Sequence, residues 1–190
     1  HEFRGVKCSP MQIVVGAGIE YLTMLLTELF DRDKSVLPLK ILVIKKIFGN
    51  TQKQQQKNKY IDVDENGLCT DRLKQTDSDI VYVTPSHQFP TGAVMPVWRR
   101  MKLLSWAEEG EDRYIIEDDY NSEFNFSIKP VPAMQGLASS DKVVYLSTFS
   151  RVLAPSIRIA YMVLPKKLLE KFDKISVHIR QPFRVLNSIR

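Results

Sequence analysis

Residues 79–120 read DIVYVTPSHQFPTGAVMPVWRRMKLLSWAEEGEDRYIIEDDY and carry the clearest structural pattern of the chain. The apolar run Ile80–Val83 predicts a buried strand, which a Thr-Pro pair ends. Apolar residues at helical spacing then predict a helix over Pro96–Glu109. A second apolar run, Tyr114–Ile116, predicts another buried strand, which ends in carboxylates. Strands separated by a helix in this way favour a mainly parallel sheet.

The same alternation extends along the chain in both directions. The β-prone run Gln12–Val15 leads through a glycine turn into a predicted helix over Ile19–Phe30, whose leucines recur at helical spacing. The sequence therefore predicts an α/β fold with a mainly parallel sheet and flanking helices. The remaining predicted elements are strands at Val143–Leu146 and Ile157–Leu164 and an amphipathic helix at Lys166–Phe172.

The composition excludes several classes of protein. The chain has 190 residues, of which 44% are hydrophobic, as in a globular protein. Its two cysteines cannot build a disulfide scaffold or an all-cysteine zinc site, and they favour a reducing, cytoplasmic compartment. No apolar run reaches the roughly 18 residues of a membrane span, so we expect no membrane partner. The chain begins with His, and we expect it to be part of a longer one.

The net charge of +5 is unevenly distributed. Three segments without acidic residues, 34–46, 51–59 and 174–190, hold eleven lysines and arginines. The rest of the chain therefore has a net charge of −6. A nucleic-acid-binding domain would carry its basic residues on a coherent surface, with a recognition motif. A direct role in binding nucleic acid is therefore not expected.

Two predicted strands end in turns that could hold a ligand, since ligands in open α/β sheets bind beyond the carboxyl ends of the strands. Gly16-Ala17-Gly18 precedes a helix, where free backbone N–H groups and the helix dipole suit a phosphate. A packing turn is the alternative. Thr84–Gly92 is a proline-containing loop, and its His87 is either a catalytic group or an ordinary loop residue.

Two other strands end in charged or hydroxyl-bearing residues. Glu117-Asp118-Asp119-Tyr120 would need a cationic partner, either a metal or a protonated ring nitrogen, unless water solvates it. Ser147–Arg151, followed by Arg158, suits a second anion site or is a plain polar loop. Taken together, the four strand ends match pyridoxal phosphate (PLP). The acid would hold its pyridine nitrogen protonated and the tyrosine would contact its ring hydroxyl.

The chain closely resembles the aminotransferase-like domain of MocR-family (GabR-like) regulators, which has the fold of type I PLP enzymes. The matching stretches cover most of 14–30 and 60–172. They are VVGAGIEYLTMLLTELF, DIVYVTPSHQFPTGAVMPVWRRMKLLSWA, RYIIEDDYNSEF, KPVPAMQGL and STFSRVLAPSIRIAYMVLP.

The resemblance implies roles for individual residues. Asp118 would pair with the pyridine nitrogen and Tyr120 with the 3′ oxygen of the ring. No metal is implied. Backbone N–H groups of Ala17, Gly18 and Ile19 would bind the phosphate, together with Ser147, Ser150 and Arg158.

The resemblance also implies the surroundings of the domain. Family members join a GntR-type winged helix-turn-helix to this domain and form homodimers, with PLP near the interface. They respond to amino-acid-like effectors and bind DNA only through the winged domain, which this chain lacks.

The chain departs from the family at Arg151, where the motif S-T-F-S-K has the lysine that forms the Schiff base with PLP. A guanidinium stays protonated and does not form that bond. The resemblance therefore implies a catalytically defective domain. Non-covalent binding of PLP through the phosphate and Asp118 remains open.

A second departure lies at 38–48, where the family has an E-N-P-G-Y-like segment and Ile44 takes the place of its cofactor-stacking tyrosine. One choice of synonymous codons for 38–44, read one base earlier, gives A-I-E-N-P-G-Y, and one such choice for 181–190, shifted in the same way, gives the family-like S-T-V-S-R-I-E-Q-Y-S. We hypothesise a truncated, frame-shifted gene, which sequencing of the locus tests. The expected organisation is a partial large domain over 1–173, divergent at 34–59, and a divergent tail over 174–190.

Three functions follow from these observations. The first is the PLP-binding, aminotransferase-like effector domain of a MocR-type regulator, truncated and defective. The second is part of a PLP-dependent aminotransferase, which Arg151 argues against. The third is a non-enzymatic dimerisation module that keeps the sheet without the cofactor.

Overall fold

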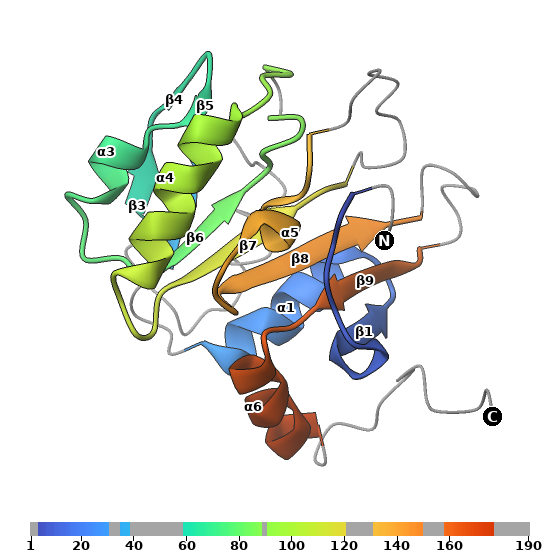
Figure 1. The fold of residues 1–190 in the computed structure, drawn as a ribbon. Helices are drawn as coiled ribbons and strands as arrows, with labels where there is room; N and C mark the ends of the chain where they lie inside the picture. The colour runs from blue at the N-terminus through green and yellow to red at the C-terminus, as the bar shows by residue number, and fades with distance from the viewer. Residues whose placement is uncertain are drawn as a thin grey trace.

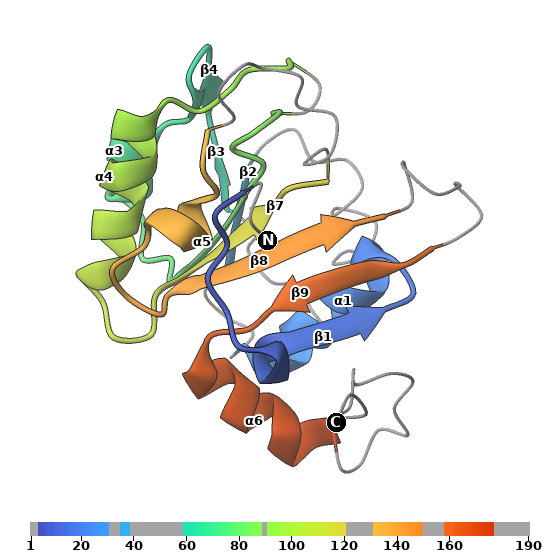
Figure 2. The same cartoon turned by 45° about the vertical axis from the view of Figure 1, so that its right-hand side comes forward.

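The computed structural model describes residues 4–30, 35–38, 59–88, 91–120, 131–149 and 158–176. Helices cover both faces of a central sheet (Figures 1 and 2). The helices are η1 (Pro10–Gln12), α1 (Ile19–Leu29), α3 (Thr70–Leu73), α4 (Val97–Glu108), α5 (Met134–Leu137) and α6 (Lys166–Ser176). The strands are β1 (Ile13–Gly16), β2 (Ser35–Pro38), β3 (Lys59–Ile61), β4 (Val63–Asp64), β5 (Gly67–Leu68), β6 (Ile80–Val83), β7 (Tyr114–Asp118), β8 (Val143–Thr148) and β9 (Ala160–Val163).

The described part of the sheet has the strand order β1-β9-β8-β7-β6-β2-β3. Strands β3, β2, β6, β7 and β8 are parallel to one another. Only β9 runs against them, because it pairs antiparallel with both β8 and β1. Strand β1 therefore runs in the same direction as β8, and the predicted mainly parallel α/β sheet is confirmed.

Alternation along the strands sends successive side chains into two hydrophobic layers. In β6, Ile80 and Tyr82 join the layer beneath α1 and α6, whereas Val81 and Val83 join the layer beneath α3, α4 and α5. Because β6 is buried on both faces, it reads as a continuous apolar run. The same double burial explains the apolar run in β7.

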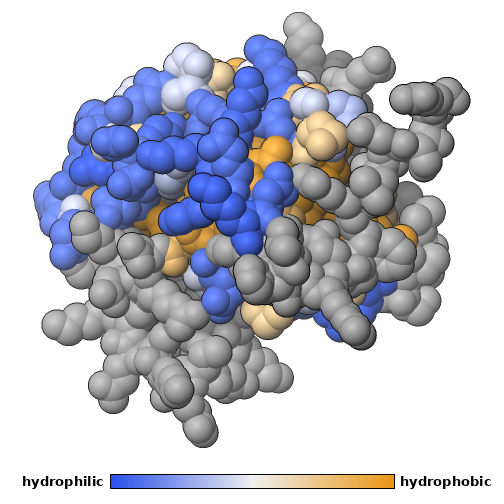
Figure 3. Space-filling view, turned by 90° about the horizontal axis from the view of Figure 1, so that it is seen from below, coloured by the Kyte–Doolittle hydropathy of each residue, from blue (hydrophilic) through white to orange (hydrophobic). Residues whose placement is uncertain are grey.

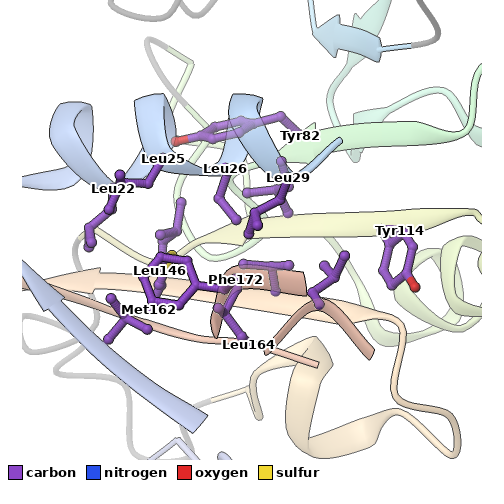
Figure 4. Packing of buried hydrophobic residues seen from close by; sticks show 14 of the residues in the cluster. Leu22, Leu25, Leu26, Leu29, Tyr82, Tyr114, Leu146, Met162, Leu164 and Phe172 are labelled. Atoms are coloured by element: carbon purple, nitrogen blue, oxygen red, sulfur yellow. The ribbon is translucent and has the colours of Figure 1, made fainter. Parts of the chain in front are cut away.

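Helix α1 packs on its layer through the leucines that predicted it. Leu22, Leu25, Leu26 and Leu29 are buried and point toward the sheet (Figure 4). The helix lies close to the strand before it. A Cβ atom added at Gly16 would lie 2.6 Å from Leu22 Cδ2. The glycine at the end of β1 therefore permits this close helix–strand packing.

Several short elements were not predicted from the sequence. They include β2, at the start of the divergent segment, and β3, β4, β5, α3 and α5. The segment 39–58 and the tail from 177 lie outside the described residues, so the reading-frame hypothesis stays untested. Within the described ranges, no helix is long and apolar enough to span a membrane. Seen from the side of α6, most of the described surface is hydrophilic, with small hydrophobic areas between (Figure 3).

Candidate functional site

The sheet topology brings the predicted site residues to one edge. The carboxyl ends of β1, β6, β7 and β8 meet there, together with the amino end of β9. This edge is where open α/β sheets bind ligands. The predicted residues that the structure describes all lie at or within three residues of these strand ends: Ala17, Gly18, Ile19, Asp118, Tyr120, Ser147 and Arg158. Ser150 and Arg151 lie outside the described residues.

Strand alternation separates the three neighbouring carboxylates of β7. Asp118 continues the row of Tyr114 and Ile116, which face α1. Glu117 and Asp119 face the opposite side. The sequence suggested one acidic cluster, whereas the structure gives Asp118 surroundings of its own.

Asp118 is a buried acid with one engaged and one unengaged oxygen. The hydroxyl of Tyr82 donates a hydrogen bond to Asp118 Oδ2. Asp118 Oδ1 is buried and has no hydrogen-bond partner among the described residues. Burial raises the pKa of Asp118 to about 7, and the charge of Asp119 adds to this effect, while the Tyr82 hydrogen bond opposes it. A buried, unsatisfied carboxylate oxygen is costly, so it marks a place for a missing donor.

Glu117 on the opposite face has a structural role. Its two oxygens accept the backbone N–H groups of Met134 at 2.8 Å and Gln135 at 3.0 Å, at the start of α5. Burial raises the pKa of Glu117 to about 7, although these hydrogen bonds favour the charged form. The carboxylate therefore caps α5 and is not available to a ligand.

Asp119 pairs through Oδ2 with residues that the sequence did not single out, while its Oδ1, like that of Asp118, is buried without a hydrogen-bond partner among the described residues. Arg4 Nε donates to Asp119 Oδ2 at 2.8 Å, and the Tyr145 hydroxyl donates to the same oxygen at 2.9 Å. Arg4 also donates to the carbonyl of Val131 at 2.7 Å and to the Ser86 hydroxyl. The N-terminal segment, dark blue in Figures 1 and 2, crosses β8 and β9 to make these contacts.

Tyr120 lies at the same edge, beside the loop that follows β6. Its hydroxyl donates to the His87 carbonyl at 2.9 Å, and the two rings lie edge to face, 6.1 Å apart between centroids. A phenolic oxygen that donates one hydrogen bond can still accept another. The structure therefore gives His87 a role in holding Tyr120, which favours the loop-residue alternative over the catalytic one.

The start of α1 forms a positively polarised corner. Gly18 precedes the helix with φ +100° and ψ 164° and provides no side-chain cap. Its own N–H donates to the Gly16 carbonyl at 2.9 Å. A Cβ added at Gly18 would lie 3.3 Å from Arg158 Nη2, so the guanidinium is next to the helix N-terminus. Helix N-termini and arginines both bind anions.

An internal anion occupies part of this corner. Arg158 Nη2 forms an ion pair with Glu20 Oε2 at 2.8 Å, and both side chains are largely exposed. Exposed pairs contribute little stability, so a phosphate could displace Glu20 at small cost. The sequence did not point to Glu20.

Ser147 takes part in a link between two strands. It is buried on the same face as Asp119, and its hydroxyl donates to the Asp119 carbonyl at 3.3 Å. This bond ties β8 to the end of β7. The expected contact of Ser147 with an anion stays a prediction. Within the described ranges, no cluster of His, Cys, Asp or Glu could hold a metal.

Substituting Gly18 by alanine is expected to cost about 1–3 kcal/mol of stability, since this φ/ψ region is accessible essentially only to glycine. Gly5→Ala is the matched control, because Gly5 has φ +66° and open space around it. We expect a smaller loss there, of about 1–2 kcal/mol. Urea unfolding of both variants measures the difference. Equal losses would contradict the geometry assigned to Gly18.

The chain is similar to bacterial transcriptional regulators, although no protein-family model matches it. It is 40% identical over 187 residues to the uncharacterized HTH-type transcriptional regulator YdeL of Bacillus subtilis, covering 95% of this chain and 39% of YdeL. It is 32% identical over 172 residues to the probable rhizopine catabolism regulatory protein MocR of Rhizobium meliloti, covering 90% and 35%. It is 35% identical over 168 residues to the pyridoxine biosynthesis regulator PdxR of Corynebacterium glutamicum, covering 86% and 35%.

Solved aminotransferases share the fold. An archaeal alanine:glyoxylate aminotransferase superposes with a TM-score of 0.79 at 22% identity, covering 94% of this chain and 46% of the enzyme. The α-aminoadipate aminotransferase LysN of Thermus thermophilus, solved with N-(5′-phosphopyridoxyl)-L-leucine, gives a TM-score of 0.76 at 25% identity, covering 88% and 45%.

The two comparisons agree on which part of a larger protein this is. The chain spans 35–39% of the length of the regulators it matches, and less than half of each aminotransferase. The sequence of the chain is similar to the regulators, and its fold is that of the fold type I aminotransferases. The chain is therefore a homologue of the MocR-type HTH transcriptional regulators and corresponds to their aminotransferase-like effector domain.

Proposed function

We propose that the chain binds PLP without a covalent bond and serves as the ligand-sensing part of a MocR-type regulator. The observation that carries this proposal is the unpartnered, buried Oδ1 of Asp118 at the ligand-binding edge of the sheet. A protonated pyridine nitrogen supplies the N–H donor that this oxygen lacks.

The other described residues fit the rest of the cofactor. The N-terminus of α1, which follows β1, and Arg158, which precedes β9, together suit a phosphate. Strand β8 separates β9 and β1 from β7, which carries Asp118. Tyr120 is held at the same edge by the hydrogen bond from its hydroxyl to the His87 carbonyl. PLP, when bound, supplies an electron sink for amino-acid chemistry. The residues of this chain bind and orient it, and Asp118 holds a proton at its ring nitrogen.

Arg151 is the reason to propose that the chain binds PLP without catalysing transamination. An arginine stays protonated and cannot make the covalent bond that a lysine amine makes with the aldehyde of PLP. We therefore propose a sensor without transaminase activity.

The proposed effector is an amino-acid-like molecule. In the whole protein the proposed partners are a second copy of the chain and, through a winged helix-turn-helix domain, DNA; the proposed compartment is the cytoplasm.

Titration with PLP tests the proposal. Isothermal calorimetry of the chain with PLP is expected to show saturable 1:1 binding, which inorganic phosphate weakens by competing at the α1 corner. Borohydride treatment followed by mass spectrometry is expected to leave the protein mass unchanged. Absence of binding would favour the dimerisation module, and a covalent adduct would favour an aminotransferase.

Arg151→Lys is expected to convert non-covalent into covalent binding. The lysine amine can react with the aldehyde of PLP, which the guanidinium cannot. After borohydride reduction, mass spectrometry should find one phosphopyridoxyl group on the variant and none on the parent chain. Arg72→Lys is the control, because it makes the same substitution at a largely exposed side chain that the proposal does not place in the cofactor site. A variant that binds PLP but never becomes labelled would contradict the assignment of position 151.

A further inference from the structure

Asp118 owes its orientation to one side chain on the neighbouring strand. Tyr82 of β6 is 1% exposed, and its hydroxyl donates to Asp118 Oδ2. This hydrogen bond crosses from β6 to β7. The strand register places Tyr82 opposite Ile116, and Asp118 is the next residue of β7 that faces the same side. Because Tyr82 holds one oxygen, the other carboxylate oxygen is left unpartnered. The hydrogen bond from Tyr82 therefore decides which carboxylate oxygen of Asp118 is available to a ligand.

The Tyr82 ring has little freedom to move. It belongs to the hydrophobic layer between the sheet and α1, with Leu25, Leu26 and Leu146 (Figure 4). Side chains in such close-packed layers sit in single rotamers. A rigid ring with its hydroxyl at the acid is a suitable support for a group that must meet a ligand in one geometry.

We propose that Tyr82 is a positioning residue, which holds the Asp118 carboxylate charged and turned so that Oδ1 meets the pyridine nitrogen of PLP. The inference rests on the proposed function, and it adds a residue that neither the motif comparison nor the strand-end pattern assigned. Tyr82 acts through Asp118 and contacts no atom of the cofactor itself.

The charges around Asp118 explain why such support is needed. Asp119, its neighbour in sequence, and Glu20 at the start of α1 both raise the pKa of Asp118, in addition to burial. Asp119 is paired with Arg4, and Glu20 with Arg158. The hydrogen bond from the Tyr82 hydroxyl and, to a smaller extent, a hydrogen bond from the backbone of Tyr120 lower the pKa of Asp118. Removing the hydroxyl therefore raises the pKa of Asp118 above about 7.

Tyr145 of β8 provides a matched control. It is also 1% exposed, and its hydroxyl donates to Asp119 at 2.9 Å. Tyr82 and Tyr145 thus each support one of two consecutive aspartates, on opposite faces of the sheet. A tyrosine-to-phenylalanine change at either position removes one buried hydroxyl and its bond to a carboxylate.

The experiment measures PLP affinity by calorimetry from pH 5.5 to 9 for the unmodified chain, Tyr82→Phe and Tyr145→Phe. A second probe is the 1-deaza analogue of PLP, which lacks the ring nitrogen. For Tyr82→Phe we expect PLP affinity to fall roughly ten-fold, as for loss of a hydrogen bond to a charged group. The inflection of affinity against pH that belongs to Asp118 should move to higher pH. Affinity for the deaza analogue should not change, and Tyr145→Phe should change neither quantity.

The outcomes separate this inference from the proposed function. If the unmodified chain does not bind PLP, both are overturned. If it binds PLP while Tyr82→Phe keeps the same affinity and pH inflection, only the role of Tyr82 is overturned. Equal losses for PLP and its deaza analogue would show a general packing role and would also overturn it. Should Tyr82→Phe fail to fold, Tyr82→Met, which also removes the hydroxyl, is compared with both probes, and an unchanged preference for PLP over the analogue overturns the role of Tyr82.

Discussion

Arg4→Ala is expected to destabilise the fold by about 3–5 kcal/mol, the typical cost of leaving one partner of a buried ion pair alone. Arg4 and Asp119 are both almost fully buried, with 2.8 Å between Nε and Oδ2. The guanidinium also donates to the Val131 carbonyl and the Ser86 hydroxyl, so the change leaves three acceptors without this donor. Chemical unfolding followed by circular dichroism measures the loss.

Two further variants separate charge from packing. Lys74→Ala breaks a pair with the same 2.8 Å separation from Glu109, but both side chains are about half exposed, so we expect at most about 1 kcal/mol. Adding Asp119→Asn to Arg4→Ala removes the uncompensated charge and should restore part of the stability. A loss at Arg4 no larger than at Lys74 would contradict the buried pair.

Asp118→Asn is expected to weaken PLP binding by about 10- to 100-fold, the range for a hydrogen bond that involves charge. Asparagine can still accept from Tyr82, but it cannot carry the negative charge that holds the pyridine nitrogen protonated. The pH inflection of affinity near 7 should disappear with the carboxylate. Calorimetry across the pH range measures both effects.

Glu117→Gln is the matched control for this change. Glu117 is the preceding residue of β7, equally buried, and burial raises its pKa to about 7 as well. It faces α5, so its neutralisation should leave PLP affinity and the Asp118 inflection in place. An equal loss of PLP affinity at both positions would show that the overall negative charge of this region, and not a contact of Asp118, controls binding.

The raised pKa of Asp118 also affects stability without a ligand. The unfolded carboxyl titrates near pH 4, whereas the folded one titrates at about 7. The folded state therefore binds more protons between these values, and stability falls as the pH rises through this window. Asp118→Asn removes this loss, so the variant should unfold at a higher denaturant concentration than the parent chain at pH 8, with a smaller gain at pH 4.

The long elements were predictable because local pattern and burial agree. Strand β6 has the bounds that its apolar run predicted, and α1 and α4 end within one residue of their predicted ends. Each of these helices presents an apolar face to one layer of the core. The short elements β4, β5, α3 and α5 have too few residues for a periodic pattern, and β3 follows a segment without one.

The candidate site was predictable only in part. The motifs and strand ends pointed to Asp118, Tyr120, Arg158 and the glycine turn, which lie at one edge of the sheet, and their roles toward a ligand stay predictions. Neither pattern pointed to Tyr82, which looked like an ordinary core residue, or to Arg4, which is 115 residues from its partner. The role of Ser147 as an anion ligand also stays a prediction, and its hydroxyl bonds to the Asp119 carbonyl.

The sequence by itself determined the parallel α/β class, the family and the strand ends that carry polar groups, because these depend on local periodicity and on short motifs. Only the tertiary structure decided which of the three neighbouring acids of β7 faces α1 and the proposed cofactor. Alternation in β7 turns Asp118 toward α1 and its neighbours toward α5 and Arg4, and the partners that neutralise or position each acid come from distant segments. Pairings between such segments arise from sheet register and chain crossing, which no local pattern records.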